Sequence, residues 1–197
     1  YAPLWAHLGE YTPLGHGPAT DLCLFLEETG YACAPGPFLA TTLFAALTGE
    51  EATGTVAIGG SDGTWAPNAD PVKTFVLEAD RVDRIAVVLQ GPAVAVIDRP
   101  DPDRLRFVAT ADFSRRIFEL DTSGLATDAQ EVAPETFAAW LDRGHVSLAA
   151  EMVGTTRRIF AMALQYAKDR IQFGRPIGSF QAIQHKLAEM SLVLERA

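Results

Sequence analysis

The chain has 197 residues, 48% of them hydrophobic, and carries a formal net charge of −9 at pH 7, so it can bury a sizeable core as one to three globular units. The negative charge argues against nucleic acid or an anionic membrane surface as a partner. The sequence has no apolar run of about 18 residues and no charged-then-apolar leader, so we expect no membrane insertion, no signal peptide and a cytoplasmic location.

Two helices are predicted near the start of the chain, Ala19 to Cys33 and Phe38 to Leu47, separated by the helix-breaking sequence Ala-Pro-Gly-Pro. Cys23 and Cys33 are too few for a metal site or a disulfide framework. Both lie in apolar, helix-like surroundings, so we interpret them as reduced thiols in the core, where free cysteine is commonly found.

Residues 52 to 121 consist of short β-branched or aromatic segments separated by Gly, Pro and Asp turns. They predict a small antiparallel β domain, with strands at segments such as Thr55–Ile58, Thr74–Leu77, Arg84–Leu89, Val94–Ile97 and Arg116–Leu120. The segment from Gly59 to Gly63 is interpreted as a hairpin turn.

A long helix is predicted from about Pro134 or Glu135 to Phe173, since proline is acceptable in a first helical turn. At ~1.5 Å per residue it would be a rod on the order of 55–60 Å, which needs partners for its apolar face, so we expect a helical bundle. Gly144 and Gly154 interrupt this helix at a cost of ~1 kcal/mol each relative to alanine. Close helix contact would compensate; the alternative is that the helix kinks or tolerates them.

A further helix is predicted after Gly174 and Pro176, with Ser179 as its N-cap. It carries an apolar stripe of Phe180, Ile183, Leu187, Met190 and Leu194. No stop signal follows the stripe and the chain does not open with methionine, so we expect a sequence truncated at both ends.

The junction between these two helices, YAKDRIQFGRPIGSFQ from Tyr166 to Gln181, is the most informative segment. It places Arg170 and Phe173 in the last turn of one helix and Gln181 in the first turn of the next. Arginine offers a planar fork of donors that suits phosphate oxygens, so Arg170 is the candidate for phosphate contact. The alternative is that Arg170 pairs with an acidic neighbour, Phe173 caps a core and Gln181 is a solvated helix residue.

The surrounding charge suits an anionic partner. Residues 154 to 197 contain seven Lys or Arg and three acids, a local balance of +4 (7 − 3) in an otherwise acidic chain. A dinucleotide would fit this balance, although a solvated helix face explains it nearly as well.

These residues resemble the acyl-CoA dehydrogenase family, whose C-terminal helical domain carries Arg-x-x-Phe-Gly followed by Phe-Gln at this spacing. The resemblance implies that Arg170 and Phe173 reach the FAD of a neighbouring subunit and that Gln181 contacts its pyrophosphate region. It also implies an α+β fold with an N-terminal helical domain, a small antiparallel β domain and a C-terminal four-helix bundle. The chain would hold the end of the first (1–50), the β domain (51–125) and the first half of the bundle (126–197).

The predicted β domain departs from the family at a flavin contact. Family members carry a Trp-Ile-Thr or Trp-Ile-Ser element whose hydroxyl and backbone meet the flavin ring. Here Trp65-Ala66-Pro67-Asn68 aligns with that element, and Pro67 provides neither a hydroxyl nor an N–H. Flavin contact from this subunit's own β domain is therefore not expected.

The long helix departs from the family at the catalytic base. One family position for the glutamate that abstracts the α-proton lies in Leu-Asp-x-Glu-Arg, and glycine stands there in Leu141-Asp142-Arg143-Gly144-His145. The other family position lies beyond Ala197, so the base is expected there or on a partner. His145 is a weaker candidate, and Glu151 falls too far along the helix to replace the missing carboxylate.

The resemblance implies a subunit of an FAD-dependent acyl-CoA dehydrogenase, a dimer or tetramer that oxidises an acyl-CoA to a trans-2-enoyl-CoA and passes electrons to an electron-transfer flavoprotein. The departures favour a supporting subunit of a heteromer, like the bacterial heterotetramers that shorten steroid-CoA side chains. The alternatives are a flavin oxidase or monooxygenase of the same fold, or a flavin-free helical scaffold. No zinc signature and no Rossmann, Walker or hydrolase motif is present, and no metal site is expected.

Overall fold

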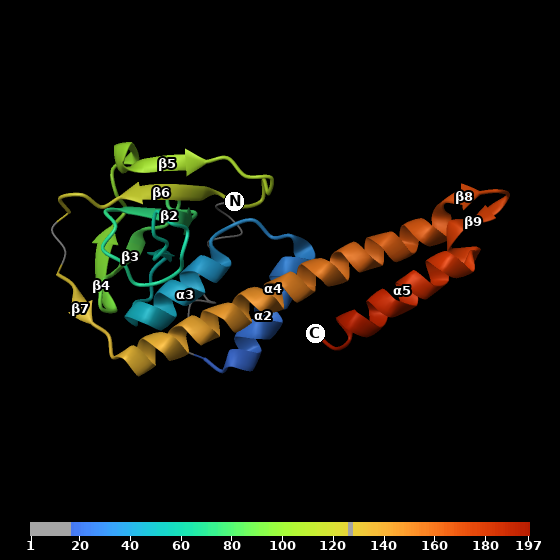
Figure 1. Cartoon of the computed structure of the whole chain (residues 1–197), viewed down its shortest axis with the longest axis horizontal. Helices are drawn as coiled ribbons and strands as arrows, with labels where there is room; N and C mark the ends of the chain where they lie inside the picture. The colour runs from blue at the N-terminus through green and yellow to red at the C-terminus, as the bar shows by residue number, and fades with distance from the viewer. Residues whose placement is uncertain (1–16, 126–127) are drawn as a thin grey trace. The chain divides into compact units, whose positions relative to one another are not determined.

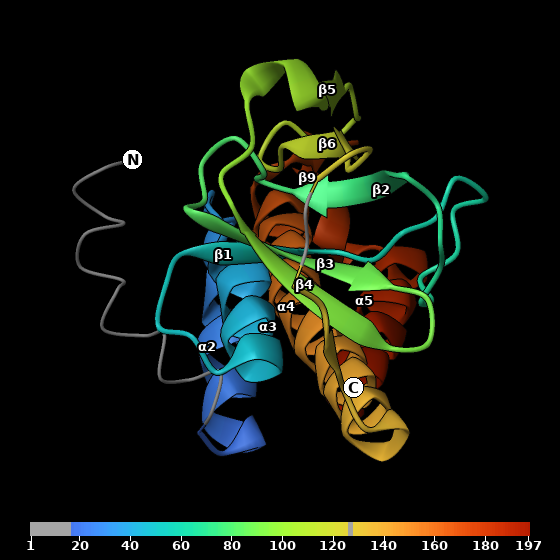
Figure 2. The ribbon, with the colours of Figure 1, turned by 90° about the vertical axis from the view of Figure 1, so that its left-hand side faces the viewer.

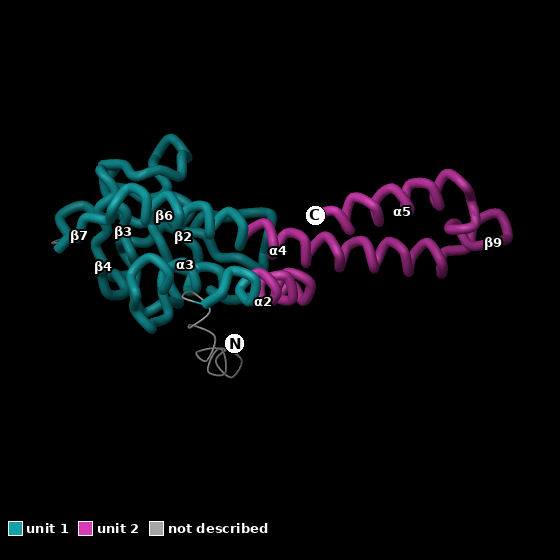
Figure 3. Tube along the Cα trace, turned by 90° about the horizontal axis from the view of Figure 1, so that it is seen from below, with its two compact units in different colours: residues 1–22, 35–147 teal, residues 23–34, 148–197 magenta. Residues whose placement is uncertain are grey.

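The computed structural model describes residues 17–125 and 128–197, which divide into two compact units (Figure 3). Unit 1 comprises residues 1–22 and 35–147, and unit 2 comprises residues 23–34 and 148–197. Helices α2 (Ala19–Ala32) and α4 (Pro134–Asp169) each contribute residues to both units. The predicted α+β class is confirmed.

The remaining helices and strands follow in chain order (Figure 1). They are α3 (Phe38–Thr48), β1 (Gly54–Ala57), β2 (Val72–Leu77), β3 (Arg84–Leu89), β4 (Ala93–Asp98), the 3-10 turn η2 (Pro102–Arg104), β5 (Leu105–Val108), β6 (Ile117–Asp121), β7 (Gln130–Glu131), β8 (Ile171–Gln172), β9 (Arg175–Pro176), the 3-10 turn η3 (Ile177–Ser179) and α5 (Gln181–Leu194).

Unit 1 contains two sheets, one with strand order β1-β3-β4-β7 and one with order β2-β6-β5. All pairs in them are antiparallel except β1 with β3, which are parallel in the register Thr55 opposite Ile85. The sequence did not predict this exception. After β1 the chain crosses to the second sheet, where it forms β2. It then crosses back, and β3 pairs with β1 running in the same direction.

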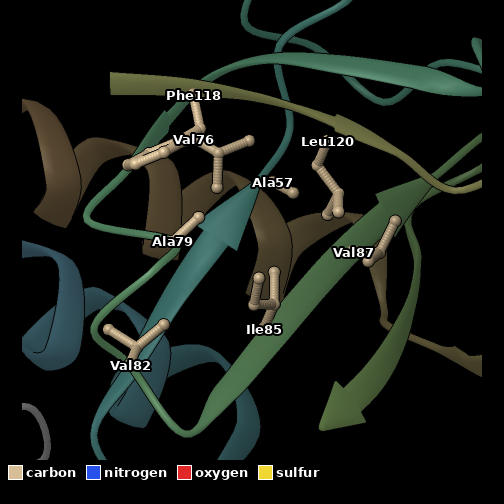
Figure 4. Close-up of a cluster of buried hydrophobic side chains, with 8 residues drawn as sticks. All are labelled: Ala57, Val76, Ala79, Val82, Ile85, Val87, Phe118 and Leu120. Atoms are coloured by element: carbon tan, nitrogen blue, oxygen red, sulfur yellow. The ribbon is translucent and has the colours of Figure 1, made fainter. Parts of the chain in front are cut away.

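The core of unit 1 lies between the two sheets. Both sheets contribute to one cluster of buried side chains, Ala57, Val76, Ala79, Val82, Ile85, Val87, Phe118 and Leu120 (Figure 4). Ala86 and Val88, on the opposite face of β3, are also fully buried, so this strand is covered on both faces. Helix α3 covers that side (Figure 2) and ends in a left-handed cap at Gly49, where φ is 76°.

The predicted helices α2 and α3 agree closely with the structure, and two other predictions are corrected. Helix α4 ends at Asp169 rather than Phe173, because residues 171–176 form a β-hairpin. Cys33 is exposed, with φ of 50°, because it follows the end of α2, and it is not a core thiol. Cys23 is half-buried, and both thiols are free. None of the helices in residues 17–125 and 128–197 combines the length and apolar character needed to cross a bilayer.

In unit 2 the end of α2 crosses α4 at two glycines. A Cβ added at Gly154 would lie 1.8 Å from the carbonyl oxygen of Glu27, and one added at Gly30 would lie 2.0 Å from that of Glu151. Only glycine fits such a close backbone approach. The predicted close contact is therefore confirmed at Gly154.

Gly144 behaves differently, in unit 1. A Cβ there would meet only the Leu43 side chain, at an ordinary 3.5 Å, so close backbone approach does not explain this glycine.

Candidate functional site

The candidate site is the segment of residues 169–181 in unit 2, called here the tip, which joins α4 to α5 (Figure 1). Strands β8 and β9 pair antiparallel, with Gln172 opposite Arg175. The two residues between them, Phe173 and Gly174, have φ of 53° and 78°. Two consecutive positive φ values are typical of a type I′ hairpin turn, which normally carries Asn-Gly or Gly-Gly.

Phe173 is strained and exposed at once. A bulky side chain in the left-handed region costs on the order of 1–2 kcal/mol. The residue is 93% exposed, and among the described residues its ring contact is an edge-on one with Phe180, at 6.2 Å between ring centroids. Phe173 therefore does not cap a core, and packing within the chain does not account for an aromatic residue at this position.

The backbone of Arg170 is held by hydrogen bonds at both its N–H and its carbonyl, whereas its side chain is exposed. Its N–H donates to the Tyr166 carbonyl at 2.9 Å, and its own carbonyl accepts from the Ile177 N–H at 2.8 Å. Its side chain is exposed and makes no ion pair within residues 17–125 and 128–197. The neighbouring Asp169 carboxylate instead accepts hydrogen bonds from Gln165. The alternative in which Arg170 pairs with a nearby acid is thus not what the described residues form.

Gln181 is the first residue of α5 and is exposed. The predicted N-cap was wrong: Phe180, with φ of −84° and ψ of 130°, is the cap residue, and it makes no side-chain capping bond. Ser179 does not cap because its hydroxyl donates to the Pro176 carbonyl at 2.7 Å, inside the 3-10 turn. The tip therefore presents Arg170, Phe173 and Gln181 to solvent.

Sequence reasoning missed Arg175, which also lies at the tip. Its guanidinium carbon is 4.2 Å from the centroid of the Phe180 ring. The only sequence signal for it was its position directly after the turn. Exposed guanidinium groups and an exposed aromatic ring fit the phosphates and flat rings of a dinucleotide such as FAD.

Hydrogen bonds within the β domain hold the segment that the resemblance pairs with the family's flavin-contacting element. The hairpin turn predicted at Gly59 to Gly63 is confirmed, since Gly60 N–H donates to the Thr64 carbonyl at 3.0 Å and Gly59 forms a bridge with Trp65. The buried Lys73 ammonium donates to Asn68 Oδ1 at 2.6 Å, and burial lowers the pKa of Lys73. The segment is thus ordered by residues of this chain.

Gly144 is the residue at which the family resemblance implies a glutamate, and its neighbour in space is apolar. Gly144 faces Leu43, and the indole N–H of Trp140 donates to the Leu43 carbonyl at 2.9 Å, so the first turns of α4 pack on α3. His145 is exposed, and no described contact orients it. Glu151 is only 7% exposed and lies at the glycine crossing in unit 2. Unit 1 thus provides no carboxylate at the family position for a base.

Comparison with known proteins places these features in context. Residues 136–197 match the sequence family described as acyl-CoA dehydrogenase, C-terminal domain. The acyl-CoA dehydrogenase IpdE2 of Mycobacterium tuberculosis is 30% identical over 187 residues, which is 92% of this chain and 54% of that protein. The chain thus spans about half the length of the curated relatives that it matches.

Two solved structures share the fold along almost the whole chain. One is a variant of the Tcur3481-Tcur3483 steroid ACAD, with a TM-score of 0.79 and 25% identity, covering 98% of this chain and 64% of that one. The other is the ChsE4-ChsE5 complex from Mycobacterium tuberculosis, with a TM-score of 0.76 and 21% identity, covering 99% of this chain and 65% of that one.

Proposed function

Because the chain belongs to the acyl-CoA dehydrogenase family, we propose that it is a subunit of an FAD-dependent acyl-CoA dehydrogenase whose tip contacts FAD bound to an adjoining subunit. The enzyme oxidises an acyl-CoA to a trans-2-enoyl-CoA and transfers the electrons to an electron-transfer flavoprotein, in the cytoplasm. FAD, when bound, supplies the hydride acceptor for this oxidation.

The state of the tip carries the proposal. Phe173 is 93% exposed in a strained conformation, and the described residues give the Arg170 side chain no carboxylate partner. Such strain persists where function requires it. A ligand presented by another subunit would use both residues: the Arg170 fork donates to two phosphate oxygens, and the Phe173 ring excludes water beside them. Gln181 adds an amide donor and acceptor at the start of α5.

Contact across an interface couples cofactor binding to assembly. A cofactor that binds only the assembled state stabilises that state. We therefore propose a dimer or tetramer, in which loss of the interface also weakens FAD binding.

We further propose that the chain is the supporting subunit of a heteromer acting on steroid or fatty acyl side chains. Gly144 occupies the position of the family glutamate and faces Leu43, where a carboxylate would meet apolar atoms. Pro67 has no hydroxyl to offer a flavin. The likeness in fold to chains of a steroid ACAD and of the ChsE4-ChsE5 complex supports the heteromer.

The test is to purify the chain alone and with a candidate partner subunit, and to measure bound FAD by its visible absorbance and turnover with acyl-CoA. We expect full FAD occupancy and turnover only in the heteromer. Full occupancy and turnover by the lone chain would contradict the heteromer. Assemblies that remain colourless with FAD would contradict flavin binding itself and favour a scaffold.

A further inference from the structure

Arg175 is held by an aromatic ring rather than by a carboxylate. Its guanidinium carbon lies 4.2 Å from the centre of the Phe180 ring, well inside the range of a cation–π contact. The residue is exposed and makes no ion pair with any residue that the structure describes. Phe180 also meets the Phe173 ring edge-on, so one ring supports both the turn residue and the arginine.

The hairpin backbone places Arg175 diagonally across from Arg170. Arg175 is opposite Gln172, and opposite residues of a β ladder project to one face. Arg170 directly precedes β8, and its N–H bonds to the Tyr166 carbonyl in the last turn of α4, so only its carbonyl takes part in the hairpin. The bond from Ile177 N–H to the Arg170 carbonyl extends the ladder to Arg170.

Arg170 and Arg175 are therefore diagonal neighbours in this ladder. Diagonal neighbours lie about 7–8 Å apart, within reach of two arginine side chains that meet over one ligand. The opposed pair of Ile171 and Pro176 lies on the other face of the hairpin from Gln172 and Arg175.

We propose that Arg175 is a second phosphate-contacting residue, and that Arg170 and Arg175 together clamp the diphosphate of the dinucleotide. This inference rests on the proposed function. Each phosphate of a diphosphate carries negative charge and at least two acceptor oxygens, so two guanidinium forks match it better than one. Stacking on Phe180 restricts the Arg175 side chain before binding, which reduces the conformational entropy lost when it meets the ligand.

The test titrates FAD into the flavin-stripped assembly of the full chain with its partner subunit. R175Q is expected to weaken FAD binding about 5- to 10-fold, since it removes charge-assisted bonds. R175K keeps the charge without the fork or the flat stacking surface and is expected to weaken binding about 2- to 4-fold. F180L leaves the arginine but removes its support, with an expected loss of about 2- to 3-fold. R196Q removes an exposed arginine of unit 2 outside the tip and is the matched control, with no change expected.

Salt provides a second readout. Between about 50 and about 500 mM NaCl, FAD affinity should fall more steeply for the wild type than for R175Q, because added ions screen a cation that the variant lacks. Circular dichroism melts verify that each variant is folded.

Equal affinity and equal salt dependence of R175Q and the wild type would overturn the clamp while leaving the proposed function intact. Loss with R175Q but not with F180L would overturn the role of the ring and keep the contact. Failure of the wild-type assembly to bind FAD would overturn both proposals.

Discussion

Two arginines of unit 2, Arg157 and Arg170, have opposite surroundings. Arg157 lies where α2 crosses α4 and donates to Glu27 at 2.6 Å and Glu28 at 3.2 Å, and these carboxylates raise its pKa. Its guanidinium also lies over the Tyr31 ring, at 5.2 Å. Arg170, at the tip, has none of these carboxylate partners. At the crossing, the arginine charge is paired with carboxylates of the same chain. At the tip, the described residues leave the Arg170 charge available to a partner molecule.

Backbone conformation shows the same contrast. At the crossing, Gly154 and Gly30 stand where only glycine fits. At the tip, Phe173 stands where glycine or asparagine would be easier, since its φ is 53°. The crossing is thus built for stability, whereas the tip gives up some stability to present an aromatic ring.

The largest expected effect is at the crossing. G154A places a Cβ 1.8 Å from the Glu27 carbonyl oxygen, so the helices must separate. We expect a loss of more than about 3 kcal/mol in the free energy of unfolding, as for severe overpacking against backbone. Urea denaturation measures it. A G154A protein as stable as the wild type would show that the helices do not approach this closely.

The next effect separates the two arginines. R170Q should weaken FAD binding by the assembly about 10- to 100-fold, the loss of charge-assisted hydrogen bonds worth about 1.5–3 kcal/mol. R157Q is the matched control: it should leave FAD affinity unchanged and have little effect on stability, because ion pairs of an exposed arginine are screened by solvent. Equal FAD affinity of R170Q and the wild type would remove the physical basis of the tip assignment.

A smaller effect tests the trade-off at the turn. F173N relieves the left-handed strain and should raise the free energy of unfolding by about 1 kcal/mol, because asparagine favours this turn position. It should also weaken FAD binding, because the ring is lost. Thermal melts and FAD titration on the same preparation test the expected gain in stability and the expected loss of FAD affinity. Unchanged FAD affinity would mean that the exposed ring has no part in cofactor contact.

The smallest effect uses the other glycine of α4. G144A adds a Cβ at 3.5 Å from Leu43, an ordinary contact, and improves helix propensity, so we expect a gain of about 0.5–1 kcal/mol. Urea denaturation of G144A and G154A side by side compares their free energies of unfolding. Destabilisation by G144A would show that the first turns of α4 pack on α3 more tightly than this contact distance suggests.

The sequence by itself determined the local elements. Periodicity and helix-breaking residues located α2 and α3 to within a residue or two, and the spacing of Gly, Ser and Asp identified the turn at residues 59–63. The motif around Arg170 also needed no coordinates, because its residue types and spacing carry the resemblance. These signals act within a few residues along the chain, so they can be read without knowing what lies nearby in space.

Tertiary structure decided everything that depends on distant neighbours. The parallel pairing of β1 with β3, the end of α4 at Asp169 and the exposure of Cys33 followed from which segments meet. Arg157 is neutralised by a carboxylate 130 residues away, and Gly154 is required by the backbone of Glu27. The local sequence gives the same prediction for Arg157 and Arg170, namely an exposed cation on or beside one helix. Only the folded chain brings acids to Arg157 and, among the residues that the structure describes, gives Arg170 none, because charge pairing depends on proximity in space and not on spacing along the sequence.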